Sequence, residues 1–231
     1  MSQARFAVYF TPAPGSALAR FGAAALGYDC EAAKDVPHLA LAGIDPADAA
    51  RVAVEPARYG FHGTLVAPFE LAGERSADEL TAALEGFVAN RAAFSLGRLK
   101  VDRIGRFIAL VPAGPQDEVA RLAADCLAAF DPFRAPLPRR DRARRLAAGL
   151  TPRQIELLDR WGYPYVLCEF RFHMTLTGPL PAGERERFRI ALAAAFAPLA
   201  DRPVEIDALS LVRQDDRAAR FGVIKRAMLA G

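Results

Sequence analysis

The chain has few cysteines and no long apolar run. Its three cysteines, Cys30, Cys126 and Cys168, lie far apart and form no CxxC pair, so neither a disulfide framework nor a thiolate zinc site is indicated. No segment reaches the ~20 apolar residues that a membrane helix needs, and the N-terminal stretch lacks the long apolar segment of a signal peptide. We therefore expect a cytoplasmic protein that has no membrane partner.

Lysine and histidine are also scarce. Lysine occurs only at positions 34, 100 and 225, so the basic residues are almost all arginine. Because alanine is abundant too, the base composition of the genome explains the excess of arginine over lysine better than phosphate recognition by arginine does. The formal net charge of +3 is compatible with anionic substrates and does not by itself indicate nucleic acid.

The order of predicted elements occurs twice along the chain. In the first half a strand (61–71) precedes a helix (76–90), which has Ser76 and Glu79 in capping-box positions, and two strands (94–101 and 106–112). The second half repeats this order, with a strand, a helix and two strands at 172–180, 184–196, 203–212 and 220–229. A further strand (5–11) and helix (16–26) come first, followed by a loop, one short helix and a loop over 29–58.

We therefore predict an α+β fold with two pseudo-symmetric antiparallel sheet lobes, flanking helices and a central cleft. A single bilobal domain is expected over 1–231, because no Gly/Ser linker divides the chain. We expect the segments 1–61 plus 62–130 and the segment 169–231 to form the two lobes, with their elements intermixed. Helices are predicted at 115–130 and 151–162, and a helical basic insert at about 131–168. Its arginines between 134 and 145 are either a solvated helix face or a cationic rim facing the substrate.

The candidate catalytic residues are two His-x-Thr pairs at equivalent points of the two halves. Alternate side chains of a strand share a face, so His62 and Thr64 project together, as do His173, Thr175 and Thr177. A neutral imidazole can take a proton from attacking water while an imidazolium protonates the departing oxygen. Threonine hydroxyls can donate hydrogen bonds to phosphoryl oxygens. This pattern predicts His62 and His173 as the acid and base, and Thr64 and Thr175 as phosphate-binding residues.

The segments HGTL and HMTL resemble the paired motifs of the 2H phosphoesterase superfamily. More narrowly, RYGFHGTLVAPFEL, LTPRQIELLDRWGYPYV and FRFHMTLTGPL resemble the DUF1045 family of putative phosphonate-metabolism proteins. The resemblance covers most of the chain. It implies acid and base work by the motif histidines on cyclic or linear phosphodiesters, phosphate binding by the hydroxyls, and no metal or other cofactor.

Other residues are weaker candidates for substrate binding. They are Arg171, two residues before His173, Tyr59 upstream of the first motif, Arg106 at the start of a strand, and Tyr163 and Tyr165 in the GYPY turn. Arg220 begins the strand of the second half that is equivalent to the one begun by Arg106. His38 has no partner motif, so we expect it to be structural or incidental.

The sequence favours a metal-independent phosphoesterase, a hydrolase whose substrate is a small sugar cyclic phosphate from phosphonate catabolism. One alternative is an RNA-end 2',3'-cyclic phosphodiesterase or 2',5' RNA-processing enzyme, which only the basic insert supports. A second is a phosphate-binding module without turnover. A metal hydrolase is disfavoured, because the scattered histidines form no usual ligand set. The sequence does not assign the acid and the base to particular histidines.

Overall fold

A computed structural model describes residues 4–230; Met1 to Gln3, part of the N-terminal stretch discussed above, and Gly231 lie outside the described residues. Within 4–230, the chain forms a large sheet with the strand order β11-β10-β1-β4-β8-β7-β6, and the short pairs β2-β3 and β5-β9. All of these pairings are antiparallel. The strands are β1 (Arg5–Phe10), β2 (Tyr28–Asp29), β3 (Lys34–Asp35), β4 (Gly63–Glu70), β5 (Phe94–Gly97), β6 (Leu99–Ile104), β7 (Phe107–Pro112), β8 (Met174–Thr175), β9 (Val204–Ile206), β10 (Ala208–Gln214) and β11 (Gly222–Met228).

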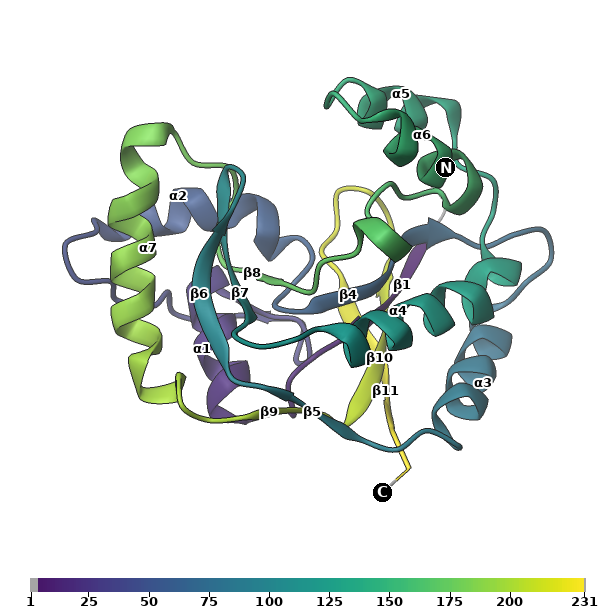
Figure 1. Ribbon diagram of the computed structural model, residues 1–231, viewed down its shortest axis with the longest axis horizontal. Coiled ribbons are helices and arrows are strands. Elements are labelled where there is room, and N and C mark those ends of the chain that lie inside the picture. The colour runs from purple at the N-terminus through teal and green to yellow at the C-terminus, as the bar shows by residue number, and fades with distance from the viewer. Residues whose placement is uncertain (1–3, 231) are drawn as a thin grey trace.

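Helices pack beside both halves of this sheet. Helix α7 contacts β6 and β7, whereas α3 contacts β10 and β11, and α4 contacts β4. Figure 1 shows α1, α2 and α7 at one side, α3 and α4 at the other, and α5 with α6 standing above the β1 end. The mixed helix and antiparallel-sheet class predicted from the sequence is confirmed. The helices are α1 (Ala17–Leu26), α2 (Pro46–Ala57), α3 (Ala77–Val88), α4 (Asp117–Phe130), α5 (Arg139–Leu146), α6 (Pro152–Trp161) and α7 (Ala182–Phe196).

Several helix starts follow from local chemistry in the sequence. Ser76 and Glu79 form the predicted capping box of α3, in which each side chain bonds the backbone N–H of the other. Thr151 and Gln154 do the same for α6. Asp45 accepts from the Ala47 amide at the start of α2. That helix has 12 residues and is therefore longer than the short helix that the sequence predicts.

The two halves of the chain exchange strands across the sheet. Strands β6 and β7 of the first half lie with β8 of the second half, and β10 and β11 of the second half lie with β1 and β4. The halves meet where β4 pairs with β8, at Gly63 opposite Met174. Both motif strands are therefore central neighbours in one sheet.

The strands predicted at 94–101 and 203–212 are wrong as single strands, since each breaks into two. Gly97, the last residue of β5, adopts a φ of 77°, in the left-handed region that favours glycine, and the strand ends there before β6 begins at Leu99. Asp207 separates β9 from β10; its carbonyl accepts from the Leu229 amide and its carboxylate from Arg226. The detached segments β5 and β9 then pair with each other outside the large sheet.

The strand predicted at 172–180 is also shorter than expected, since only Met174–Thr175 form β8. The amides of Leu176 and Thr177 both donate to the Ile108 carbonyl, and the Gly178 amide donates to the Val52 carbonyl towards α2. The backbone thus leaves the sheet ladder immediately after Thr175.

Side chains along β1 alternate between two hydrophobic clusters, one on each face of the sheet. Phe6, Val8 and Phe10 are buried in the main core, whereas Ala7 and Tyr9 belong to a smaller cluster on the opposite face. That second face carries the histidines described below. Among the helices of residues 4–230, none is both long enough and apolar enough to span a bilayer.

Candidate active site

The pairing of β4 with β8 places the two His-x-Thr segments side by side. Gly63 lies opposite Met174 in antiparallel register. Extended by one residue in each direction, this register sets His62 opposite Thr175 and Thr64 opposite His173. All four side chains fall on the same face, because each is one residue from the Gly63–Met174 pair. The histidines are diagonal neighbours, whose backbones are typically roughly 7–8 Å apart.

Two hydrogen bonds, one donated by Nδ1 and one accepted by Nε2, hold the His62 imidazole. Nδ1 lies 2.9 Å from the Gly60 carbonyl oxygen, which can only accept, so Nδ1 carries the proton. In the neutral ring Nε2 is then an acceptor, and it receives the Thr64 hydroxyl at 2.9 Å. Tyr9 stacks on the imidazole, with ring centroids 3.6 Å apart and 17° between the planes. His62 thus presents Nε2 as a base towards the Thr64 side.

His173 has a closely similar arrangement. Its Nδ1 donates to the carbonyl of Arg171, again two residues earlier, at 2.9 Å. The Phe107 ring lies 5.6 Å from the imidazole centroid. Nε2 has no hydrogen-bond partner within residues 4–230, so the atom that can exchange a proton with a substrate is available.

Burial lowers the pKa of both histidines. Loss of solvent lowers the pKa of His62 to about 4, and the nearby charge on His173 contributes in the same direction. The pKa of His173 is also lowered, first by burial and then by the charge of Arg171. Both rings are therefore neutral at pH 7 in the free protein. A bound phosphate anion would raise both pKa values, because it stabilises imidazolium.

The opposite face of these strands is anchored by close packing. The ring of Phe172 lies against Gly63 so closely that a Cβ there would be 2.5 Å from ring atoms. Phe61, next to His62, packs in the same way against Gly22 of α1. Both phenylalanines are buried. Gly63 is therefore required by the approach of Phe172, and the packing fixes both motif backbones.

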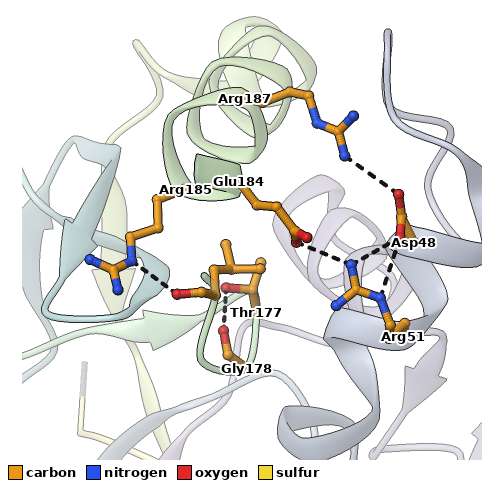
Figure 2. Close-up of polar contacts among 8 residues, drawn as sticks. Asp48, Arg51, Thr177, Gly178, Glu184, Arg185 and Arg187 are labelled. Atoms are coloured by element: carbon orange, nitrogen blue, oxygen red, sulfur yellow. Dashed lines mark hydrogen bonds and ion pairs between the residues drawn. The ribbon is translucent and has the colours of Figure 1, made fainter. Parts of the chain in front are cut away.

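Thr177 is not on the histidine face, which corrects the sequence prediction. Its side chain is buried, accepts from the Ile108 amide at 3.1 Å and donates to the Gly178 carbonyl at 2.9 Å. Figure 2 shows this bond beside the two ion pairs that link α2 to α7, Arg51 with Glu184 and Arg187 with Asp48. The change of backbone direction after β8 thus turns Thr177 into a structural residue.

The weaker candidates lie in different settings. Tyr59 is half-buried and stacks on Phe221 at 5.5 Å, in the cluster that contains Tyr9. Arg171 is exposed, and Arg106 is exposed in the turn between β6 and β7; neither guanidinium forms an ion pair among the described residues. Tyr163 packs edge-on against the exposed Tyr165 at 5.6 Å.

Two residues considered in the sequence analysis are engaged away from the histidines. Arg220 pairs with Asp35 of β3 at 2.5 Å and lies over the Tyr28 ring. His38 is exposed, and its ring lies over Gly27, where a Cβ would be 2.4 Å from it. These contacts account for both side chains structurally.

Sequence reasoning missed two residues on or beside the histidine face, Tyr9 and Arg5, and it did not single out Arg145 within the basic insert. The two-residue period of a strand predicts that Arg5 and Tyr9 share a face of β1. The sequence does not predict that β1 pairs with β4, which sets Tyr9 opposite Thr64. Arg145 comes from α5 and lies over the Tyr163 ring, 4.8 Å from its centroid.

Within residues 4–230, no group of three or more His, Cys, Asp or Glu side chains is arranged to hold a metal ion. The three cysteines are free, with Cys30 and Cys126 buried and Cys168 exposed.

The fold and this geometry define an α+β protein that presents two His-x-Thr pairs on adjacent antiparallel strands. The family model described as "Protein of unknown function (DUF1045)" matches residues 64–222. The chain therefore belongs to the DUF1045 family, as the sequence motifs predicted. The matched range contains Thr64, His173 and Thr175, and His62 lies two residues before it.

Two curated relatives carry the name ribose 1,5-bisphosphate phosphokinase PhnN. The protein from Janthinobacterium sp. (strain Marseille) is 37% identical over 234 residues, which is 100% of this chain and 52% of that protein. The protein from Laribacter hongkongensis (strain HLHK9) is 38% identical over 225 residues, 97% of this chain and 52% of that protein. The chain thus spans about half the length of these relatives.

Solved structures with a related arrangement include TT0787 of Thermus thermophilus, with a TM-score of 0.46, 15% identity and 98% coverage of both chains. E. coli LigT complexed with ATP has a TM-score of 0.44 at 15% identity, with 100% coverage of both chains.

Proposed function

We propose that this chain is a metal-independent phosphoesterase that hydrolyses a cyclic or linear phosphodiester with His62 and His173 as base and acid. The observation that carries this proposal is the register of β4 and β8, in which each histidine lies opposite the threonine of the other motif. A phosphoryl group placed on this face, over the two strands, would then meet two imidazoles and two hydroxyls.

The reaction follows from the roles that these groups can take. One imidazole takes a proton from water as the water oxygen attacks phosphorus. The bond from phosphorus to the leaving oxygen breaks, and the other imidazole, protonated in the complex, gives its proton to that oxygen. For a cyclic phosphate the product is a phosphomonoester. The hydroxyls of Thr64 and Thr175 donate to the phosphoryl oxygens as negative charge develops.

We assign the base to His62 and the acid to His173. The ring of His62 is the more strongly desolvated, with a pKa of about 4, so it stays neutral most readily. Its Nε2 accepts from the Thr64 hydroxyl in the free protein; when that hydroxyl turns to a phosphoryl oxygen, the Nε2 lone pair is free to take the proton from water. His173 retains an unoccupied Nε2 among the described residues and is the one that an anionic substrate protonates first.

The substrate we propose is a small sugar cyclic phosphate of phosphonate catabolism. The two curated relatives are named for a ribose bisphosphate kinase, although this chain spans only half of each. That name supports a phosphorylated ribose, such as a ribose 1,2-cyclic phosphate, as the substrate.

The test is hydrolysis of a panel of compounds in EDTA, followed by phosphorus NMR of the products. Ribose 1,2-cyclic and nucleoside 2',3'-cyclic phosphates are compared directly. Faster turnover of the ribose compound to a phosphomonoester is expected. Preference for the nucleotide, with affinity falling steeply as salt rises, would instead assign the chain to RNA ends, and binding without turnover would indicate a phosphate-binding module.

A further inference from the structure

Arg5 lies on the face of β1 that also carries Tyr9, the residue stacked on His62. Four residues separate them, which is about 13 Å of extended strand. Its Nε donates to the amide oxygen of Gln214 at 2.8 Å, and its guanidinium lies 5.3 Å from the Phe221 ring centroid. Within the described chain, Arg5 forms no ion pair with a carboxylate. The positive charge of Arg5 is therefore stabilised only by the neutral amide of Gln214 and the face of the Phe221 ring among the described residues.

Arg145 reaches the same region from α5. Its guanidinium is stacked over Tyr163 at 4.8 Å, and its buried Nε has no hydrogen-bond partner among residues 4–230. Arg145 also forms no ion pair with any of the described carboxylates. Burial is the main cause that lowers the pKa of both Arg5 and Arg145, yet both remain charged at neutral pH.

Arg5 and Arg145 line one open pocket with a cavity volume of about 30 Å³. The two acids in that lining already have partners. Arg217 binds Glu70 at 2.9 Å and Asp141 at 2.7 Å. The pocket thus holds two partly desolvated cations that form no ion pair within the described chain.

An unpaired, partly buried guanidinium is unfavourable unless an anion completes it. Arginine is also the side chain best suited to bind a phosphate with two parallel hydrogen bonds. The pocket adjoins the histidine face through Phe221: Arg5 lies 5.3 Å from the centroid of this ring, and Tyr9, which stacks on His62, lies 6.3 Å from it. Arg5 is about 13 Å along the strand from Tyr9. A substrate whose phosphate lies at the histidines would therefore need a second anionic group to engage Arg5.

We propose that Arg5 and Arg145 form a second phosphate subsite, which binds a phosphomonoester carried by the same substrate whose cyclic phosphate lies at the two His-x-Thr pairs. This inference rests on the proposed function for the position of the first phosphate. The substrate class is then a sugar that bears both a cyclic phosphate and a separate terminal phosphate.

The experiment compares ribose 1,2-cyclic phosphate with and without a 5-phosphate as substrates. Arg145→Gln and Arg5→Gln should each lower kcat/KM for the 5-phosphorylated compound roughly ten- to a hundred-fold, while kcat/KM for the unphosphorylated compound stays unchanged. Arg145→Lys, which keeps the charge but not the two-point geometry, should lose less. Arg139→Gln is the matched control, since Arg139 is exposed on the same helix, and it should change neither rate.

A purely structural role for these arginines predicts equal losses on both substrates, or none, and would overturn the subsite while leaving the phosphoesterase proposal intact. If the wild type hydrolyses neither compound, calorimetric titration with ribose 5-phosphate tests the subsite independently of catalysis. Binding by the wild type that both Gln variants lose would support the subsite although the proposed reaction had failed. Absent binding, or equal affinity in all variants, would contradict the subsite.

Discussion

Gly63 and Met174 face each other in the single register position that joins β4 to β8. This relationship converts two short sequence motifs, more than a hundred positions apart, into one cluster of two imidazoles and two hydroxyls. The duplication alone does not create the cluster. It also needs the strand exchange that brings the second motif between β4 and β7.

The pH dependence should be bell-shaped and centred on the acid side. kcat/KM reports the free protein, so it should rise as His62, with a pKa of about 4, loses its proton. It should fall as His173, with a pKa below its ordinary value of 6.5, loses the proton needed to act as an acid. The kcat profile should lie at higher pH, because the anionic substrate raises both values. Rates that increase steadily from acid to alkaline pH would contradict the pairing.

The assignment of acid and base predicts different responses to the leaving group. A p-nitrophenyl phosphodiester needs little protonation of its leaving oxygen, so His173→Ala should lose far less activity on it than on a sugar phosphate. His62→Ala should lose roughly a hundred- to ten-thousand-fold on both. Measured rates with the reverse pattern would exchange the two roles.

Substitution of the threonines should separate substrate binding from structure. Thr64→Val and Thr175→Val should lower kcat/KM roughly ten- to a hundred-fold, the equivalent of about 1.5–3 kcal/mol for a hydrogen bond to a charged oxygen, with little change in unfolding free energy. Thr177→Val should instead lower the unfolding free energy by about 1–3 kcal/mol, because the buried Ile108 amide loses its partner. Denaturant unfolding and steady-state kinetics of all three variants give the comparison.

The close approach of Phe172 to Gly63 predicts a large effect from one added methyl group. Gly63→Ala should destabilise the fold by about 1–3 kcal/mol, because its Cβ would lie 2.5 Å from the ring. Gly86→Ala is the control: a Cβ there meets nothing within 4 Å, and in helix α3 it should stabilise by about 0.5–1 kcal/mol. Equal melting temperatures for the two variants would contradict this prediction and show that the Phe172 ring moves aside at little cost in free energy.

Local patterns predicted much of this structure. The capping box at Ser76, the His-x-Thr faces and the repeated element order all depend on neighbours in sequence, so they were readable. The break at Asp207 was not, because an apolar alternation continues through it and only the bonds to Leu229 and Arg226 reveal it.

The surroundings of the histidines depended on long-range contacts. Tyr9 reaches His62 only because β1 pairs with β4, a pairing that no short motif encodes. Arg145 sits in a basic run, and its sequence neighbours gave no sign that its guanidinium would stack on Tyr163. In the same run, Arg142 pairs with Asp159 at 2.7 Å, whereas Arg139 and Arg140 are exposed.

The most direct test of the two-histidine mechanism is the rate of cyclic phosphate hydrolysis in EDTA by wild type, His62→Ala, His173→Ala and the double variant, each checked for folding. Activity that survives EDTA, is lost in both single variants, and falls no further in the double variant is the predicted result, since the residues act as a unit. A folded single variant with wild-type activity, or activity abolished by EDTA and restored by zinc, would contradict it.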